Sequence, residues 1–438
     1  GGNDFAPQTM VDGEPVQGYL QRHYVDAIKQ VAMRLKDLPN VVGYDTMNEP
    51  DAGFIGWEDL ESTADTLRLG EAPTPLQSML LGAGFPQDVD IYRLGLTGFR
   101  RRGRRRLNPD GVRVWREGCK GIWRENGVWD LAEDGTPRLI RPNHFSRVQD
   151  RPVDFVNDYL RPFAVRYAQG IRSVDPEALI FVEGPPGCDP PRWDLRKVPN
   201  MVHAAHWYDV MTLFTKRFIP FLGADFSRRR LVLGRRRVER SFAAQLAHVK
   251  AESEGQMGGM PTLIGEFGIP FDLGNRRAYR SGDFSLQARA MDVSFQAIEA
   301  NLLHCTLWNY TADNDNERGD QWNGEDLSIF SRDQQTDPSS IHSGGRALEA
   351  VVRPYAHKVA GEPLEMRFDV AERAFELSFR HDAAVLAPTE IFIPNLQYPR
   401  GYRVEVSDGT FEIDQEAQIL TYHHSSDQDT HRIRVSPT

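Results

Sequence analysis

The chain has 438 residues, of which 40% are hydrophobic and 26% are charged, a composition that is ordinary for a globular protein. Its formal net charge of −10 gives no global support to nucleic-acid binding, so we expect no nucleic-acid partner. Cysteines occur only at Cys119, Cys188 and Cys305, without metal-binding spacing, so we expect free thiols in a reducing, cytoplasmic compartment. This length suffices for one large α/β domain and a small second domain.

The first segments of the chain predict a helix, a strand and a long insertion. Apolar residues recur at helical spacing over residues 20–39, and a short apolar run then ends in Asn48-Glu49-Pro50. Residues from about 51 to 150 read as a long irregular insertion that is rich in Gly, Pro, Arg and Trp. Its closely spaced tryptophans, at 115, 123 and 129, favour an ordered, packed excursion that could form a wall for an apolar group or merely shield the barrel.

Strand and helix patterns then alternate as far as about residue 310. The runs with strand character cover residues 178–184, 201–208, 261–268 and 302–310. The segments with helical periodicity cover residues 153–173, 242–254 and 285–301. Because several of these strands end in polar or aromatic residues, the alternation predicts a (β/α) barrel with functional groups at its carboxyl rim.

The pattern changes after Tyr355. Short alternating runs, separated by turns such as Asp408-Gly409, predict a small antiparallel β-sandwich. We therefore divide the chain into a barrel domain, residues 1–355, and a C-terminal sandwich domain, residues 362–438.

Two arginine-rich runs, residues 100–106 and 228–237, oppose the acidic balance of the chain. We interpret them as solvated faces of a loop or helix. The alternative is a patch that contacts anionic lipid head groups at a membrane surface. Nucleic-acid binding through these runs is the weakest interpretation, because the chain as a whole is acidic.

Glu49 and Glu266 each end a short apolar run beside small or turn-forming residues. A buried parallel strand delivers side chains in this way to the rim of a barrel. Two carboxyl groups on different strands are what a retaining glycosidase needs, about 5–5.5 Å apart, one as nucleophile and one as proton donor. The run Asn48-Glu49-Pro50 is a weak signal alone, and the later Gly265-Glu266-Phe267-Gly268 strengthens it.

Together these runs resemble glycoside hydrolase family 5, whose members are retaining glycosidases built on a (β/α)₈ barrel. The resemblance implies that Glu49 is the acid/base, that Asn48 binds the 2-hydroxyl of the sugar and that Glu266 is the nucleophile. It likewise implies that His206 and Tyr208 orient the nucleophile.

Trp308 lies in the last predicted barrel strand, residues 302–310, and the resemblance makes it the floor of the sugar site. Residues 107–112, 123–129, 314–317 and 319–328 resemble the glucosylceramidase and steryl-β-glucosidase branch, and endoglycoceramidases share its two-domain plan. Asn323 and Glu325, with Asp326, could hydrogen-bond glucose hydroxyls or belong to a network within their loop.

Residues 313–319 are rich in Asp and Asn, but their glycine falls one position late for an EF-hand calcium loop. We therefore expect no metal site, and the reaction implied by the resemblance requires no cofactor. Members of the family carry three βα units before the Asn-Glu-Pro strand, for which this chain has almost no room. We thus expect an α/β fold with strands four to eight of a (β/α)₈ TIM barrel and a C-terminal β-sandwich, and an upstream fragment as a partner that completes the barrel.

The resemblance implies a retaining β-glucosidase acting on a glucolipid, either glucosylceramide or a sterylglucoside, as its substrate partner. One alternative is an endoglycoceramidase or another endo-β-glucanase of the same family. An alternative of another class is a non-catalytic glycolipid-binding protein, which is consistent with the expected lack of the first three barrel strands.

Overall fold

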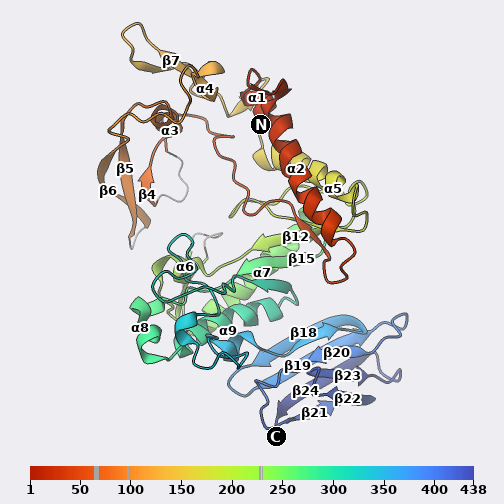
Figure 1. Cartoon of the computed structure of the whole chain (residues 1–438). Helices are drawn as coiled ribbons and strands as arrows, with labels where there is room; N and C mark the ends of the chain where they lie inside the picture. The colour runs from red at the N-terminus through yellow and green to blue at the C-terminus, as the bar shows by residue number, and fades with distance from the viewer. Residues whose placement is uncertain (64–68, 96–97, 226–227, 229) are drawn as a thin grey trace. The chain divides into compact units, whose positions relative to one another are not determined.

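The computed structural model describes residues 1–63, 69–95, 98–225, 228 and 230–438. Arg229, in the second arginine-rich run, lies outside these residues. The chain forms two compact units, residues 1–201 and 202–438 (Figure 1). None of the helices in the described ranges is long and apolar enough to cross a membrane. Cys119, Cys188 and Cys305 are free thiols, as predicted.

The first unit contains two parallel strands and a pair of packed helices. Strand β3 (Gly43–Asp45) pairs in parallel with β11 (Leu179–Val182). Helices α2 (Val16–Leu35) and α5 (Arg161–Arg172) lie side by side (Figure 1). A Cβ atom on Gly170 would lie only 2.3 Å from Val25 Cγ1, so the glycine permits this close approach. The other short elements of the first unit are α1 (Gly2–Phe5), β1 (Met10–Val11), β2 (Glu14–Pro15), β9 (Arg147–Val148), β10 (Arg151–Pro152) and the π-helix η1 (Phe155–Leu160).

The insertion after β3 is more regular than predicted. An antiparallel sheet forms from β4 (Gly70–Ala72), β5 (Gln87–Gly95) and β6 (Gly98–Leu107), with helices α3 (Pro75–Gly82) and α4 (Ile122–Glu125) and the hairpin β7 (Trp129–Leu131) and β8 (Pro137–Leu139). Trp129 is 2% exposed, and Trp123 packs edge-on against Phe145 with ring centroids 4.8 Å apart. The predicted ordered packing is therefore confirmed for Trp123 and Trp129.

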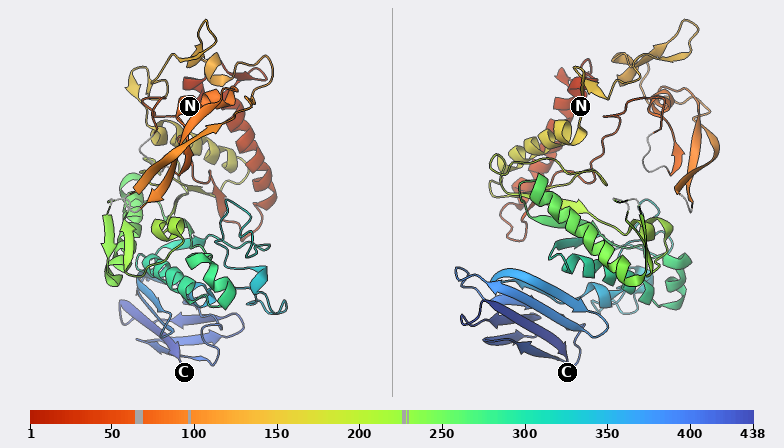
Figure 2. Two further views of the ribbon diagram at one scale, coloured as in Figure 1. Left: turned by 90° about the vertical axis from the view of Figure 1, so that its left-hand side faces the viewer. Right: turned by 180° about the vertical axis from the view of Figure 1, so that it is seen from behind.

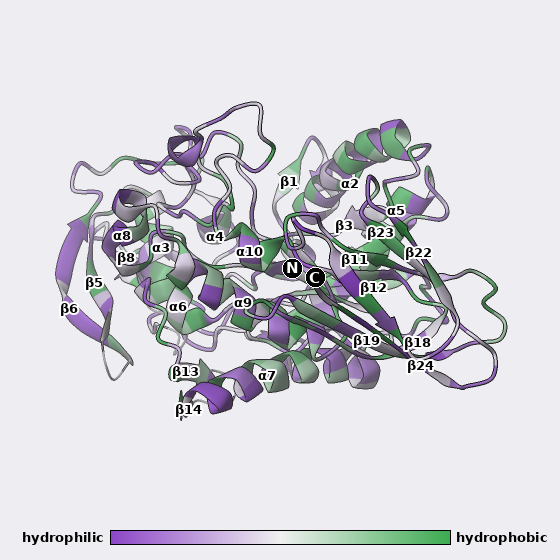
Figure 3. Cartoon of the chain, turned by 90° about the horizontal axis from the view of Figure 1, so that it is seen from below, coloured by the Kyte–Doolittle hydropathy of each residue, from purple (hydrophilic) through white to green (hydrophobic). Residues whose placement is uncertain are grey.

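Our interpretation of the first arginine-rich run as a face of a loop or helix is wrong. Residues 100–106 lie in strand β6, which Figure 3 shows as hydrophilic. Arg101 and Arg104 pair with Asp90, and Arg105 pairs with Glu71, so carboxylates on β5 and β4 offset much of the positive charge. The arginines pair across strands, which helical or loop periodicity could not indicate.

The second unit begins with three parallel strands, in which β15 (Thr262–Phe267) pairs with β12 (Met201–His206) and with β16 (His304–Leu307). Helices α7 (Arg235–Gln256) and α9 (Ser285–Glu299) contribute to the apolar core against these strands. The predicted parallel barrel strands with intervening helices are confirmed. The shorter elements of the second unit before the sandwich are α6 (Val210–Thr215), β13 (Leu222–Asp225), β14 (Arg230–Leu233), α8 (Leu273–Ser281), the 3-10 helix η2 (Arg332–Gln334) and α10 (Leu348–Val351).

Two four-stranded antiparallel sheets end the chain and stack as layers (Figure 2). One sheet has the order β17 (Tyr355–Lys358), β20 (Thr389–Phe392), β23 (Ile419–His423) and β22 (Thr410–Asp414). The other has the order β18 (Gly361–Asp369), β19 (Ala374–His381), β24 (Thr430–Pro437) and β21 (Tyr402–Val406). Inward-facing residues of both sheets, among them Phe375, Leu420 and Val435, form a closed core. The C-terminal antiparallel sheets are confirmed, whereas the domain limits at 355 and 362 stay a prediction.

A buried ionic network holds the sandwich to helix α9. Arg353 donates to both oxygens of Glu299, at 2.6 and 3.1 Å, and to Asp292 at 3.0 Å. Glu299 also accepts the main-chain N–H of Phe368 on β18 at 3.2 Å. Burial raises the pKa of Glu299, and the charge of Arg353 opposes that rise.

Candidate active site

Glu266 lies near the end of β15, where the pairing of this strand with β12 is irregular. Regular pairing shifts between Ala205 and His206, and His206 then lies opposite Glu266. A second shift, between Ile264 and Phe267, interrupts the pairing of β15 with β16. Irregularities of this kind re-aim side chains at the ends of strands, and here they flank the predicted nucleophile on both sides.

Two glycines beside Glu266 let neighbouring chains approach the strand end. A Cβ atom on Gly268 would lie 2.1 Å from the carbonyl oxygen of Trp308, a distance no side chain tolerates. On Gly265, a Cβ atom would lie 3.0 Å from the carbonyl oxygen of Ala204. Close backbone packing thus requires a glycine at Gly268 and leaves little room for a side chain at Gly265.

The carboxylate of Glu266 is held by two side chains from the end of β12. Tyr208 Oη donates a hydrogen bond to Glu266 Oε2 at 2.8 Å, and His206 Nδ1 lies 3.2 Å from the same oxygen. The His206 and Glu266 side chains are only 9% and 14% exposed, so these contacts act with little competition from water. Together they fix the orientation of the carboxylate.

The residue between these two side chains points the other way. Trp207 is 7% exposed, packs edge-on against Phe242 and donates from Nε1 to Gln245 at 3.2 Å. Because successive side chains of an extended segment alternate, burying Trp207 in the core turns His206 and Tyr208 toward Glu266. His203 is a buried core residue: it contacts Ser253 Oγ at 2.8 Å, and burial lowers its pKa to about 4.

The predicted platform residue Trp308 follows β16 directly. Its main-chain N–H donates to the carbonyl of Phe267 at 2.9 Å, which ties it to the strand that carries Glu266. The side chain is half-buried, and the peptide bond between Trp308 and Asn309 is cis.

The loop after Trp308 is organised by buried carboxylates. Asp320 accepts hydrogen bonds from Asn309 at 3.2 Å, from Asn314 at 2.9 Å and from the main-chain N–H of Leu327 at 2.8 Å. Asp326 accepts from Asn314 at 2.9 Å and pairs with the fully buried Arg346, whose Nη1 lies 3.0 Å from Asp326 Oδ2. Asp326 therefore belongs to the network within the loop.

Asn323 and Glu325 are not among the side-chain partners of Asp320 and Asp326 named above, although the main-chain N–H of Asp320 donates to the carbonyl of Glu325 at 2.9 Å. Asn323 is exposed and has a φ of 49°, a left-handed conformation that asparagine tolerates in turns. The main-chain N–H of Glu325 donates to the carbonyl of Trp322 at 2.9 Å, which closes the turn. Their predicted contacts with glucose hydroxyls stay a prediction.

In the first unit, Asn48 and Glu49 follow β3 in a turn held by other side chains. Glu49 has a φ of 41°, and its main-chain N–H donates to Oε2 of Glu183 at 2.9 Å. Glu183 follows β11 and is 4% exposed. Two further bonds hold the approach to the turn: Tyr24 Oη donates to the carbonyl of Thr46 at 2.8 Å, and Met47 N–H donates to its neighbour Asp45 at 2.9 Å.

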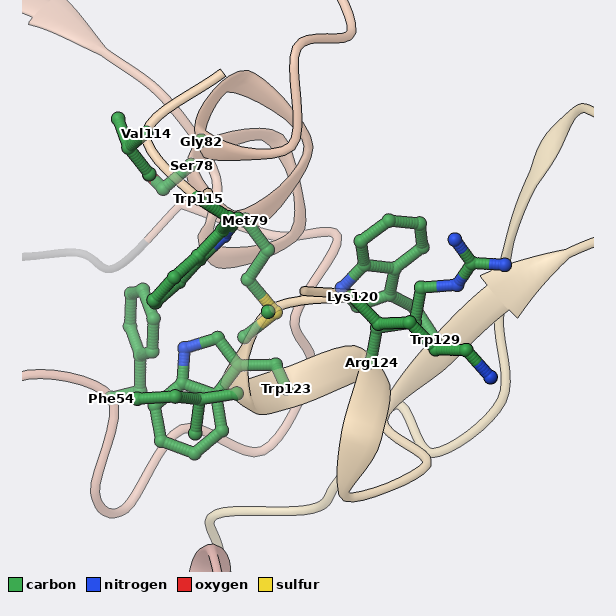
Figure 4. A pocket seen from close by; sticks show the side chains of 12 residues that line it. Phe54, Ser78, Met79, Gly82, Val114, Trp115, Lys120, Trp123, Arg124 and Trp129 are labelled. Carbon is green, nitrogen blue, oxygen red and sulfur yellow. The ribbon is translucent and has the colours of Figure 1, made fainter. Parts of the chain in front are cut away.

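The insertion contains a separate, apolar cavity of about 250 Å³. Phe54, Trp115 and Trp123 gather on one side of it, and Met79 points toward it (Figure 4). Lys120 and Arg124 also line the cavity. Such an apolar wall with a few polar groups is typical of a site for a nonpolar ligand or part of one.

Comparison with known proteins decides the family. Residues 353–435 match the model of the glycoside hydrolase family 5 C-terminal domain. A glucosylceramidase of Rhizopus delemar is 34% identical over 96% of this chain, and the crystal structure of Cryptococcus neoformans sterylglucosidase 1 is 30% identical with a TM-score of 0.91. The chain belongs to glycoside hydrolase family 5.

Within family 5, the chain lies in the glucosylceramidase and steryl-β-glucosidase branch. The match with sterylglucosidase 1 covers 100% of this chain and 70% of that chain, and the chain spans 65% of the length of the Rhizopus relative. Endo-glycoceramidase II from Rhodococcus sp., solved in complex with ganglioside GM3, shares the fold at 17% identity and a TM-score of 0.53, over 100% of this chain and 66% of that chain.

The structure brings three of the predicted site residues, His206, Tyr208 and Glu266, into contact in the second unit. Two others, Asn48 and Glu49, lie in a turn of the first unit. The predicted separation of the two carboxyl groups stays a prediction. Sequence reasoning missed Glu183, although a carboxylate directly after an apolar strand was a usable signal. Arg346 gave no local signal, because its partner Asp326 is 20 residues away.

Proposed function

We propose that the protein is a retaining β-glucosidase that cleaves the β-glucosidic bond of a glucolipid. The observation that carries this proposal is the anchoring of Glu266 by Tyr208 and His206 at the end of a parallel strand. A carboxylate held in one orientation suits nucleophilic attack, because the reacting atoms must be aligned. The membership of the chain in family 5 supports the same reaction.

In the proposed reaction, an oxygen of Glu266 attacks C1 of glucose while Glu49 gives its proton to the departing lipid oxygen. The products of this step are a covalent glucosyl-enzyme and the free lipid alcohol. Water then attacks C1, Glu49 takes its proton, and the bond to Glu266 breaks to release glucose with retained configuration. Trp308 offers an aromatic face to the sugar ring, and Asn48 binds the 2-hydroxyl.

We assign the substrate class from the relatives. They are named as glucosylceramidases and a sterylglucosidase, so we propose glucosylceramide or a sterylglucoside as the substrate. The apolar cavity in the insertion supports a lipid substrate, and we propose that its tryptophans contact part of the aglycone. A cavity of about 250 Å³ holds a segment of a lipid rather than the whole of it.

The proposal is tested by glucose release from glucosylceramide, from a sterylglucoside and from a ganglioside, with the full-length protein. Hydrolysis of the first two but not of the ganglioside supports an exo-acting β-glucosidase, whereas release of an intact ganglioside oligosaccharide would assign the endo activity instead. Saturable binding of all three lipids without any hydrolysis would contradict catalysis and favour the glycolipid-binding alternative. Glu266→Gln is the matched inactive control, because it keeps the size of the side chain.

The cavity is tested separately with Trp115→Ala. We expect a higher KM for the lipid substrate and an unchanged KM for a small aryl glucoside, which lacks the lipid. Val114→Ala is the control, because that side chain is 72% exposed at the same rim. Equal changes in KM for both substrates would show that the cavity does not contact the aglycone.

A further inference from the structure

Three histidines meet at one end of the C-terminal sandwich, within the second unit. His381 ends strand β19, His431 lies on the adjacent strand β24, and His424 follows strand β23 of the facing sheet. One ring nitrogen from each lies within 4.8 Å of those of the other two. His381 and His431 are 50 residues apart in the sequence, which explains why no spacing motif marks the cluster.

A carboxylate orients the most buried of the three rings. His431 is fully buried, and its Nδ1 lies 2.8 Å from Asp408 Oδ2. Asp408 is held in turn by the hydroxyl of Ser407 at 2.6 Å and by the main-chain N–H of Ser425 at 2.7 Å. The Asp408 carboxylate accepts the Nδ1 proton, so the lone pair of His431 lies on Nε2, the nitrogen that faces His381.

His381 Nδ1 lies 3.0 Å from His431 Nε2. With its lone pair on Nε2, His431 accepts the Nδ1 proton of His381 in this arrangement. Two nitrogens bound to one tetrahedral zinc ion at about 2.0–2.1 Å would lie roughly 3.3 Å apart, so the ion replaces this hydrogen bond when the two rings separate slightly and turn their lone pairs toward it. The proton leaves Nδ1 of His381, and its Nε2 becomes the protonated nitrogen.

The surroundings also suit a metal ion. Phe379 is fully buried and packs against His431 with ring centroids 5.1 Å apart, so the back of the cluster excludes water. His381 and His424 are half-buried, which leaves a route from solvent to the cluster. Three imidazoles with a carboxylate behind one of them are the ligand set that zinc and similar divalent transition metals prefer.

We propose that His381, His424 and His431 bind a divalent transition-metal ion, with zinc as the expected metal, and that the ion cross-links the two sheets of the sandwich. Its ligands come from β19 and β24 of one sheet and from the end of β23 in the other. An ion that binds only the folded arrangement stabilises it.

The test uses the full-length protein after treatment with EDTA and dialysis. Isothermal titration with ZnSO₄ should show a site of unit stoichiometry, and zinc should raise the Tm. His424→Ala should abolish both effects, and His423→Ala, which changes the exposed neighbouring histidine on β23, should preserve them. Asp408→Asn should weaken zinc binding about 10–100-fold, as expected for loss of the group that orients a ligand.

Cobalt provides a readout that does not depend on a variant folding well. Co²⁺ bound to the wild-type protein should give visible absorption bands of a low-symmetry, nitrogen-bound ion, and zinc should displace it. The proposal is overturned if wild-type protein binds no zinc, or if His424→Ala and wild type bind it equally. In either case the histidines form only a hydrogen-bonded cluster.

Discussion

The main-chain N–H of Glu49 donates a hydrogen bond to Oε2 of Glu183 at 2.9 Å. Glu49 holds a φ of 41°, a conformation that costs a non-glycine residue free energy unless its surroundings stabilise it. Glu183 supplies such stabilisation from β11, a strand 134 residues further along the chain. The proposed proton donor therefore depends on a buried carboxylate that need not touch the substrate.

Replacing this carboxylate should impair proton donation more than nucleophilic attack. We expect Glu183→Leu to slow hydrolysis of alkyl β-glucosides about 10²-fold, the effect of a misplacement near 1 Å. Hydrolysis of 2,4-dinitrophenyl β-glucoside should change little, because its leaving group needs no proton. The comparison of kcat/KM for the two substrates is the measurement, and Glu183→Gln, which keeps an acceptor oxygen, should restore part of the activity. Equal losses on both substrates would point to general unfolding.

The hydroxyl of Tyr208 should matter for the nucleophile. We expect Tyr208→Phe to lower kcat about 10²-fold or more, as is typical when one preorganised hydrogen-bond donor is removed from a reacting group. Tyr310→Phe is the control, because that ring is 64% exposed. Steady-state kinetics on an aryl glucoside checks the prediction, and wild-type rates for Tyr208→Phe would remove the role assigned to the 2.8 Å contact with Glu266.

Gly268 should tolerate no side chain. Gly268→Ala would place a Cβ atom 2.1 Å from the carbonyl oxygen of Trp308 and would force β15 and β16 apart. We expect a loss of stability of about 1–3 kcal/mol, typical of overpacking, together with loss of activity. Gly255→Ala is the matched control in α7, where no atom lies within 4 Å of the new Cβ, and it should stabilise by about 0.4–1 kcal/mol. Urea unfolding of both variants is the measurement.

The Arg353 network predicts a pH-dependent effect on stability. Arg353→Met leaves the buried Glu299 and the half-buried Asp292 without their cation and should destabilise the protein by about 3–5 kcal/mol at pH 8. Burial raises the pKa of Glu299, and loss of Arg353 removes the charge that opposes this rise. The folded state therefore binds a proton more readily than the unfolded state, so the stability of the variant falls as pH rises through the folded pKa.

We thus expect Arg353→Met to be less destabilising at pH 5 than at pH 8. Arg403→Met is the control, because Arg403 and Glu405 form an exposed pair that should contribute no more than about 1 kcal/mol. Chemical unfolding at the two pH values provides the comparison. A destabilisation that grows toward acid pH would contradict the assigned role of Glu299.

The features that could be predicted from the sequence are those that depend on residues close together in the chain. The runs of β12 and β15 were visible in sequence because a buried parallel strand reads as a continuous apolar stretch, and the resemblance to family 5 supplied the roles of His206, Tyr208 and Glu266 at their ends. The bond between Glu183 and Glu49 was not visible, because it joins residues 134 positions apart. Register explains the error on β6, whose arginines pair with acidic residues of β5 that only the fold brings alongside.

The central claim is that Glu266 is the nucleophile of a retaining β-glucosidase. Incubation of the full-length protein with a 2-deoxy-2-fluoro-β-glucoside inactivator, followed by intact-mass analysis and peptide mapping, tests it most directly. We predict a single glycosyl adduct, carried by the peptide that contains Glu266 and absent from Glu266→Gln. An adduct on another carboxylate, or no adduct in folded protein that hydrolyses β-glucosides, would contradict the claim.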